Sequence, residues 1–198
     1  MKVVLADYGA GNLRSVCSAL ERAGAEPVVS ADPDEVREAP LAIIAGVGHL
    51  RSAADGLAAR ALDEALRERA ASARPLLGIC VGMQLLFGES DEGGEGLGLL
   101  DGPVLRLRAR RVPHMGWNAL SVSGGELLAG LDGADVYFAH SYAAAPAGDV
   151  AVATVDHDGT IVAAVESGAL AGVQFHPERS AAAGARTLRN ALAWSRSA

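Results

Sequence analysis

The first half of the chain alternates short apolar runs with amphipathic stretches. The apolar runs predict buried strands at Lys2–Ala6, Glu26–Val29, Leu41–Ile44 and Pro75–Ile79. The amphipathic stretches predict helices at Leu13–Ala23, from Asp32-Pro33 onward, and over Ser52–Ala73 with a break near Gly56. Strands that alternate with helices predict an α/β fold: a doubly wound, mostly parallel sheet with helices on both faces.

The second half contains short strand patterns separated by turns. These patterns lie at Val104–Leu107, Trp117–Val122, Val136–His140, Val150–Val155, Thr160–Val165 and Ala169–Phe175. Asp156–Gly159 has the composition of a hairpin turn, and Gly184–Ser195 predicts a C-terminal helix. We therefore expect antiparallel strands added to the parallel sheet. Since no repeat or linker divides the sequence, we expect a single domain over residues 1–198.

The stretch Gly78-Ile79-Cys80-Val81-Gly82 joins a predicted strand to a helical pattern. This is the pattern of a nucleophile elbow, in which the reactive side chain stands at the apex of a tight turn. At the start of a helix, unpaired N–H groups favour a thiolate at Cys80. The N–H of Val81 would face an oxyanion formed on a carbon that Cys80 attacks. Taken alone, the motif also fits a buried core cysteine.

Two further segments are predicted to meet Cys80. The loop Gly46-Val47-Gly48 leaves the carboxyl end of a strand, the edge at which doubly wound sheets place their ligand crevice, and its N–H groups would complete an oxyanion hole. His176 and Glu178 follow a strand pattern two residues apart. In extended chain such residues point to the same side, so the carboxylate can orient the imidazole of an activated Cys–His pair.

Composition excludes several classes of function. Seventeen Lys and Arg against 24 Asp and Glu give a net charge of −7, which disfavours a nucleic-acid partner. With two cysteines, Cys17 and Cys80, no disulfide scaffold is expected, and a reducing cytoplasm fits. Met1 leads directly into a strand pattern, so we expect no secretory signal, and no apolar stretch is long enough for a membrane span.

Cofactor chemistry is not expected either. The five histidines lack the spacing of metal ligands, so we expect no catalytic metal. The glycine-rich turn with Gly9 and Gly11 lacks the third glycine of the dinucleotide fingerprint, so we expect neither NAD nor FAD.

Motifs along most of the chain resemble the class I (triad) glutamine amidotransferases. The matching segments are Asp7–Leu13, Gly46–Gly48, Gly78–Gln84, Pro113–Asn118, Tyr137–Tyr142 and Gln174–Ser180. The cysteine elbow and the His-Pro-Glu segment are typical of the whole class. The Asp-Tyr-Gly-x-Gly-Asn, Pro-His-Met-Gly-Trp-Asn and Phe-x-His-Ser-Tyr segments are typical of members whose ammonia serves histidine biosynthesis.

The resemblance implies a role for each matching residue. Cys80 attacks the side-chain amide of glutamine and forms a γ-glutamyl thioester, His176 transfers the protons, and Glu178 orients His176. The resemblance also implies oxyanion donors at Val81, Gly46, Val47 and Gly48. Glutamine is expected to be held by Gly48, Gln84, His140, Ser141 and Tyr142.

The resemblance further implies a protein partner. The family members in question pass ammonia to a separate (βα)₈-barrel synthase subunit, and Asn12, Trp117, Asn118 and Arg179 would face it. Since one amidotransferase domain would occupy the whole chain, we expect the synthase on another subunit.

Two positions depart from the family pattern. Ala45 replaces the proline that usually precedes Gly-Val-Gly, from which we expect a looser oxyanion loop. Arg179 stands where the family usually has lysine, which changes the geometry of a partner contact.

Three other interpretations stay open on the sequence. In the first, the chain is a paralogous glutaminase that feeds a different barrel synthase. In the second, it is a partner-binding subunit without catalysis, and in the third it is a stress-type cysteine hydrolase of similar fold. The intact Cys80, His176 and Glu178 favour catalysis, and the Pro113–Asn118 segment favours the histidine pathway.

Overall fold

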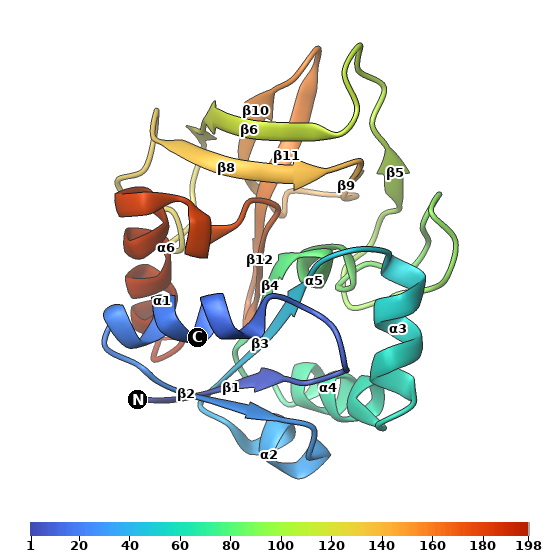
Figure 1. The fold of residues 1–198 in the computed structure, drawn as a ribbon, viewed down its shortest axis with the longest axis vertical. Helices are drawn as coiled ribbons and strands as arrows, with labels where there is room; N and C mark the ends of the chain where they lie inside the picture. Colours follow the sequence, from blue (N-terminus) through green and yellow to red (C-terminus); the bar gives the residue numbers. More distant parts are fainter. Residues whose placement is uncertain (198) are drawn as a thin grey trace.

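An eight-stranded mixed sheet forms the centre of the computed structural model, which describes residues 1–197 (Figure 1). The strand order is β2-β1-β3-β4-β12-β11-β10-β7. The bounds are β1 (Lys2–Ala6), β2 (Glu26–Ser30), β3 (Leu41–Gly46), β4 (Leu76–Cys80), β7 (Ser121–Val122), β10 (Ala151–Asp156), β11 (Thr160–Ser167) and β12 (Leu170–Val173). The pairs from β2 to β12 are parallel and those from β12 to β7 are antiparallel, so the predicted fold class is confirmed.

Helices cover both faces of this sheet. α1 (Leu13–Arg22) and α6 (Ala181–Trp194) pack together on one side, and α2 (Pro33–Glu38), α3 (Leu50–Ala58) and α4 (Leu62–Ala71) lie on the other (Figure 1). As the sequence predicts, α2 begins with Asp32 as its N-cap and Pro33 in its first turn.

The helical stretch predicted over Ser52–Ala73 is broken, as expected, but the break lies a few residues after Gly56. Gly56 lies within α3, and the chain turns instead at Ala61, which has a φ of 56°. A Cβ atom on Gly56 would stand 2.5 Å from the carbonyl oxygen of Tyr8. This glycine therefore allows α3 to pack closely against the turn that follows β1, and does not end a helix.

Two short antiparallel ribbons lie beyond the main sheet, in the upper part of Figure 1. One pairs β5 (Val104–Arg106) with β9 (Tyr142–Ala144), and the other pairs β6 (His114–Ala119) with β8 (Asp135–His140). The strand predicted over Trp117–Val122 is divided, because Leu120 is buried and bonds to the backbone of Ala134 and Gly133. The strand β9 was not predicted, and α6 begins three residues earlier than predicted.

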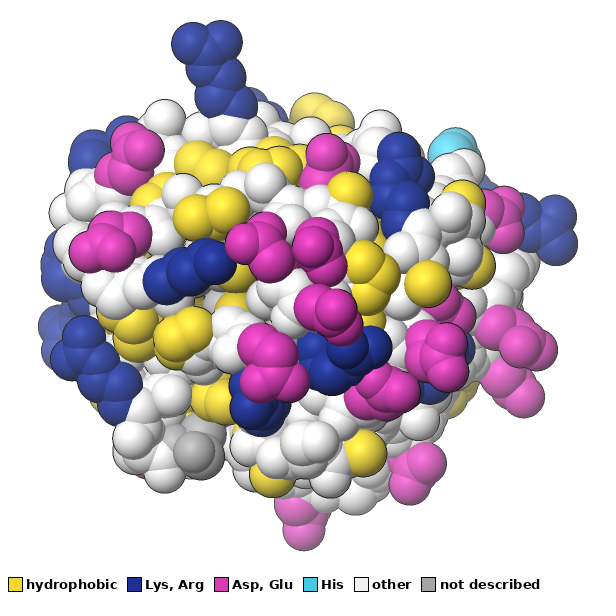
Figure 2. Space-filling view, turned by 90° about the horizontal axis from the view of Figure 1, so that it is seen from below, with side chains coloured by type: hydrophobic (Ala, Val, Ile, Leu, Met, Phe, Trp, Pro, Cys, Tyr) yellow, Lys and Arg dark blue, Asp and Glu magenta, His cyan; other side chains and the backbone are white. Residues whose placement is uncertain are grey.

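The face seen from below carries charges of both signs, interspersed with small apolar areas (Figure 2). Three ion pairs link α2 to neighbouring segments: Lys2 with Glu35, Arg37 with Glu68, and Arg74 with Glu38. None of the helices in residues 1–197 has the length and apolar character needed to cross a membrane.

Arg69 is a fully buried cation beneath this face. Its guanidinium donates to the carbonyl oxygen of Pro75 at 2.6 and 3.0 Å, and to those of Val36 and Arg37 at 2.9 Å. Burial lowers the pKa of Arg69 to about 10, so the group stays charged at neutral pH. Arg69 thus ties the end of α2 to the residue that precedes β4.

We expect Arg69→Met to lower the free energy of unfolding by about 3 kcal/mol, because three carbonyl oxygens lose the guanidinium as a donor. Urea unfolding of the purified protein measures this loss. Arg110→Met, which removes an exposed ion pair with Asp158, is the control and should leave the midpoint nearly unchanged. Equal midpoints for the two variants would contradict this account of Arg69.

Candidate active site

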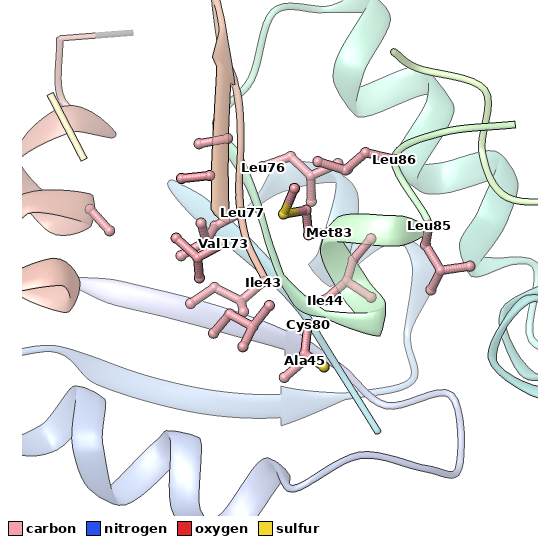
Figure 3. Packing of buried hydrophobic residues seen from close by; sticks show 14 of the residues in the cluster. Ile43, Ile44, Ala45, Leu76, Leu77, Cys80, Met83, Leu85, Leu86 and Val173 are labelled. Atoms are coloured by element: carbon pink, nitrogen blue, oxygen red, sulfur yellow. The ribbon is translucent and has the colours of Figure 1, made fainter. Parts of the chain in front are cut away.

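Cys80 stands at the turn between β4 and α5 (Val81–Gln84). Its φ of 54° is unusual for a residue other than glycine, as expected for a nucleophile elbow. A Cβ atom on Gly82 would lie 1.8 Å from the carbonyl oxygen of Ile44, so only glycine permits this approach of α5 to β3. In Figure 3 the side chain of Cys80 lies beside Ala45, at the edge of the cluster of apolar side chains.

The helix after Cys80 is shorter than the sequence predicts. α5 is a single turn, because the backbone N–H groups of Leu97 and Gly98 donate to the carbonyl oxygens of Leu85 and Phe87, which a longer helix would use internally. A four-residue helix has a small dipole, so the predicted dipole contribution to the thiolate is correspondingly small. Other groups must stabilise a charged sulfur.

The contact between His176 and Glu178 predicted from their spacing is present. His176 follows β12, and its Nδ1 atom lies 2.9 Å from Oε1 of Glu178, which belongs to the 3₁₀ turn Pro177–Arg179. The backbone N–H of His176 donates to the carbonyl oxygen of Tyr137, which fixes the chain at this point. Glu178 is buried behind the ring, with 1% of its side chain exposed.

The charges around His176 favour its imidazolium form. Burial lowers its pKa, but the neighbouring Cys80 and Glu178 outweigh that effect and raise the pKa to about 10. A proton therefore resides on His176 at neutral pH, with Cys80 and Glu178 as its two side-chain neighbours. This is the electrostatic arrangement of an activated cysteine.

A cavity of about 530 Å³ opens on Cys80 and His176. Eleven of the residues predicted from the sequence line it: Asn12, Val47, Gly48, Cys80, Val81, Gln84, His140, Ser141, Tyr142, His176 and Arg179. Four predicted residues are not among its lining: Gly46, Trp117, Asn118 and Glu178.

Ala45 lies in regular structure, and the looser oxyanion loop expected after it stays a prediction. Ala45 is buried within β3, opposite Ile79 of β4, and its carbonyl oxygen accepts the hydroxyl of Tyr8 at 2.9 Å. Burial, and secondarily the nearby Cys80, raise the pKa of Tyr8, so the hydroxyl stays protonated and donates. Regular structure therefore continues through Gly46, which lies opposite Cys80, and the irregular loop begins at Val47.

His140 has no ring nitrogen free for a substrate. Its Nδ1 lies 2.8 Å from the carbonyl oxygen of Tyr142, and its Nε2 lies 3.0 Å from Nδ1 of His114. Because a carbonyl only accepts, Nδ1 of His140 carries hydrogen, and His114 donates to Nε2. Burial lowers the pKa values of His140 and His114 to about 3 and 4, so both rings are neutral.

Asn118 and Trp117 lie on opposite faces of β6. The Asn118 carboxamide points inward and donates to the carbonyl oxygen of Asp156 at 2.8 Å, with His114 Nε2 at 3.3 Å. Trp117 and Met115 point outward and are 55% and 65% exposed. The predicted outward role therefore fits Trp117, whereas the side chain of Asn118 is used inside the protein.

The sequence interpretation missed three features of the cavity. Glu92 lines it, with its carboxylate 2.8 Å from Nδ1 of His49 and 2.6 Å from the backbone N–H of Leu50. Asn12 contacts Glu178 at 3.4 Å as well as lining the cavity. Gln174 lies 3.7 Å from the sulfur of Cys80. Only Gln174 had a sequence signal, because it precedes His176 by two residues in a strand pattern.

Comparison with known proteins agrees with this geometry. The model of the family described as glutamine amidotransferase class-I matches residues 4–193. An imidazole glycerol phosphate synthase subunit HisH from Mycobacterium bovis is 45% identical over 196 residues, which cover 95% of each chain. The protein of the same name from Corynebacterium diphtheriae is 46% identical over 208 residues, covering 96% of this chain and 97% of the relative.

Solved structures share the fold. A structure described as a glutamine amidotransferase superposes with a TM-score of 0.81 at 21% identity, over 98% of both chains. The structure of PurLQS from Thermotoga maritima gives 0.77 at 24% identity, again over 98% of both chains.

The raised pKa of His176 predicts how folding stability depends on pH. An unfolded histidine has a pKa of about 6.5, and that of His176 is about 10 in the folded protein. The stabilisation by the imidazolium is therefore complete below about pH 6.5 and disappears as the pH rises through 10. His176→Gln should cost at least about 1 kcal/mol more unfolding free energy at pH 6 than at pH 10.5. Equal losses by urea unfolding at the two pH values would disprove the raised pKa.

Proposed function

Because the chain belongs to the class-I glutamine amidotransferase family, among relatives named imidazole glycerol phosphate synthase subunit HisH, we propose that Cys80, His176 and Glu178 hydrolyse glutamine. The chain is a glutaminase of this class and a subunit of the synthase that serves histidine biosynthesis. The observation that carries the proposal is the cavity onto which Cys80 and a charged His176 both open.

The first half of the reaction forms the thioester. The thiolate of Cys80 attacks the carbonyl carbon of the glutamine side-chain amide, and negative charge develops on the oxygen. The N–H groups of Val81, Val47 and Gly48, which line the same cavity, are the proposed donors to this oxyanion. The imidazolium of His176 then protonates the departing nitrogen, the C–N bond breaks, and ammonia leaves.

The second half returns the enzyme to its starting state. Once the sulfur is bound in the thioester, its negative charge is gone, and one of the causes of the raised His176 pKa disappears. The neutral ring then accepts a proton from water, whose oxygen adds to the thioester carbon. The C–S bond breaks to give glutamate and the thiolate. Glu178 keeps the ring oriented through both halves.

Charges in the cavity suit a free amino acid. Glu92 and Arg106 both line it and are proposed to complement the α-ammonium and α-carboxylate groups of glutamine. Both side-chain hydrogens of Gln84 are used, by the carbonyl oxygen of Tyr142 and by Gln174, so Gln84 offers the substrate its oxygen. No group of His, Cys, Asp and Glu within residues 1–197 is arranged to hold a metal ion.

The proposed partner is a (βα)₈-barrel synthase subunit that consumes the ammonia and forms imidazole glycerol phosphate and AICAR. Met115 and Arg179 line the cavity, and the guanidinium of Arg179 lies 4.3 Å above the ring of Tyr137. The exposed Trp117 packs edge-on against the same tyrosine ring. Aromatic residues and arginine are enriched at the centres of protein interfaces. A partner docked here would cover the cavity, so the ammonia formed at Cys80 would be released next to the partner.

The other interpretations have less support. The names of the relatives favour the histidine pathway over a paralogous glutaminase for another synthase. The match to the class-I glutamine amidotransferase family disfavours the interpretation as a stress-type cysteine hydrolase. A non-catalytic subunit is disfavoured by the His176–Glu178 pair and its neighbour Cys80. The unpaired thiols of Cys17 and Cys80 fit the proposed location in the cytoplasm.

Glutamate release tests the catalytic proposal. The purified chain is assayed alone, with the barrel subunit, and with the barrel subunit and its nucleotide ligand. We expect a low rate alone that rises strongly in the full mixture, and loss of that rate in Cys80→Ala. Background rates in all three mixtures, with the complex formed, would leave the non-catalytic subunit as the better interpretation. Failure to form a complex would favour the paralogue.

Trp117→Ala tests the docking surface. Loss of a central aromatic anchor should raise the dissociation constant for the barrel subunit about 30-fold, or about 2 kcal/mol. Val29→Ala is the matched control, because Val29 is an exposed apolar residue on β2 at the edge of the main sheet. Calorimetric titration gives both constants, and a Trp117→Ala value within twofold of the parent would place the interface elsewhere.

A further inference from the structure

We propose that Gln174 is a further catalytic residue, which donates a side-chain N–H to the sulfur of Cys80 and stabilises the thiolate. The proposal rests on the glutamine chemistry proposed for Cys80 and adds a second group that acts directly on the reacting atom. Its basis is the 3.7 Å distance between Nε2 of Gln174 and Sγ of Cys80, within a fully buried part of the protein.

The sheet register places Gln174 beside the nucleophile. β12 runs parallel to β4 and pairs Val173 with Ile79, so the next residues along the two strands are Gln174 and Cys80. His176 lies two residues further on and lines the cavity together with Cys80, while Phe175 between them packs against Phe138. Gln174 contacts the sulfur and is fully buried, whereas His176 is among the residues that line the cavity.

Neighbouring groups determine which end of the Gln174 carboxamide faces the sulfur. Gln84 Nε2 lies 2.8 Å from the carbonyl oxygen of Tyr142, which only accepts, so this atom of Gln84 is a donor. The same nitrogen lies 3.0 Å from Gln174, whose facing atom must therefore be the oxygen. The NH₂ group of Gln174 is left pointing at Cys80, so the contact is a hydrogen-bond donation to sulfur.

A buried carboxamide at this position needs a reason. Gln174 is 0% exposed, and taking a polar group out of water is unfavourable unless it is hydrogen-bonded. Among residues 1–197, the sulfur of Cys80 is the one acceptor that the side chain of Gln174 contacts. The oxygen of Gln174 accepts from Gln84 and its NH₂ group has the Cys80 sulfur as its partner, so a carboxamide serves both contacts where an apolar side chain would serve neither.

The contact serves the step in which the thioester breaks. Water oxygen bonds to the thioester carbon, its proton goes to His176, and the electron pair of the breaking C–S bond returns to Cys80. A donor already directed at the sulfur stabilises the thiolate that leaves. Because the carboxamide is neutral, it stabilises this charge without repelling the imidazolium of His176.

Gln174→Met tests the proposal, because methionine has a similar volume and no N–H. Alkylation of Cys80 by iodoacetamide at neutral pH should become about tenfold slower, since a hydrogen bond to a charged group is removed. The thiolate absorbance at 240 nm should fall with it, and the alkylation rate should reach its plateau at higher pH. The kcat for glutamine in the complex should fall more than KM changes.

Three further variants separate catalysis from packing. Gln174→Asn keeps a carboxamide, but its side chain is one methylene too short to contact the sulfur, so it should slow alkylation similarly. This variant replaces Gln174→Met in the test if Gln174→Met does not fold. Gln84→Met removes the donor that orients the Gln174 carboxamide but keeps the NH₂ group of Gln174, so it should slow alkylation less than Gln174→Met does and should also change KM. Thr187→Val removes a buried hydrogen bond in α6, remote from the cavity, and should alkylate at the parent rate.

Parent alkylation rates in folded Gln174→Met or Gln174→Asn would overturn the proposal. Greater slowing by Gln84→Met than by Gln174→Met would also overturn it, because the effect on the sulfur would then come from Gln84 and not from the Gln174 donor. Alkylation requires neither glutamine nor the partner, so these outcomes are distinct from a failure of glutamine hydrolysis.

Discussion

The parallel pairing of β4 with β12 is the constraint on which the candidate site depends. It aligns Gly172 with Gly78 and Val173 with Ile79. This pairing brings together the two segments that leave these strands. The turn at Cys80 follows β4, and the segment with His176 follows β12. A shift of one residue would turn Gln174 and His176 away from the sulfur and direct Phe175 toward it. Backbone hydrogen bonds in the buried centre of the sheet thus determine the chemistry.

The turn between β1 and α1 supports both the proposed oxyanion loop and the His176–Glu178 pair. Tyr8 bonds to the carbonyl oxygen of Ala45, just before the proposed oxyanion loop, and Asn12 contacts the carboxylate of Glu178. Both residues come from one short segment that packs against α3 at Gly56. The oxyanion loop and the histidine–glutamate pair therefore share one support, although they are more than 100 residues apart in the sequence.

The sequence predicted the parts of this site that depend on local geometry. The elbow at Cys80 and the His176–Glu178 contact follow from spacing within one turn or one strand, and the parallel half of the sheet follows from the alternation of strands and helices. The split at Leu120, the short α5 and the inward Asn118 depend on contacts with distant segments. Gln174 was missed for a related reason. From the sequence alone, a glutamine in a strand cannot be assigned a role at Cys80, because the pairing of β12 with β4 is not known.

The two faces of β6 have different consequences for how this protein can change. The outward residues Met115 and Trp117 are exposed, whereas inward His114 and Asn118 belong to a chain of neutral hydrogen bonds that ends at the carbonyl oxygen of Tyr142. Substitutions on alternate positions of a single strand are thus subject to separate requirements. A lineage can adapt the proposed docking surface to a diverging partner through odd-numbered positions of β6, while the even-numbered ones preserve the shape of the proposed glutamine pocket.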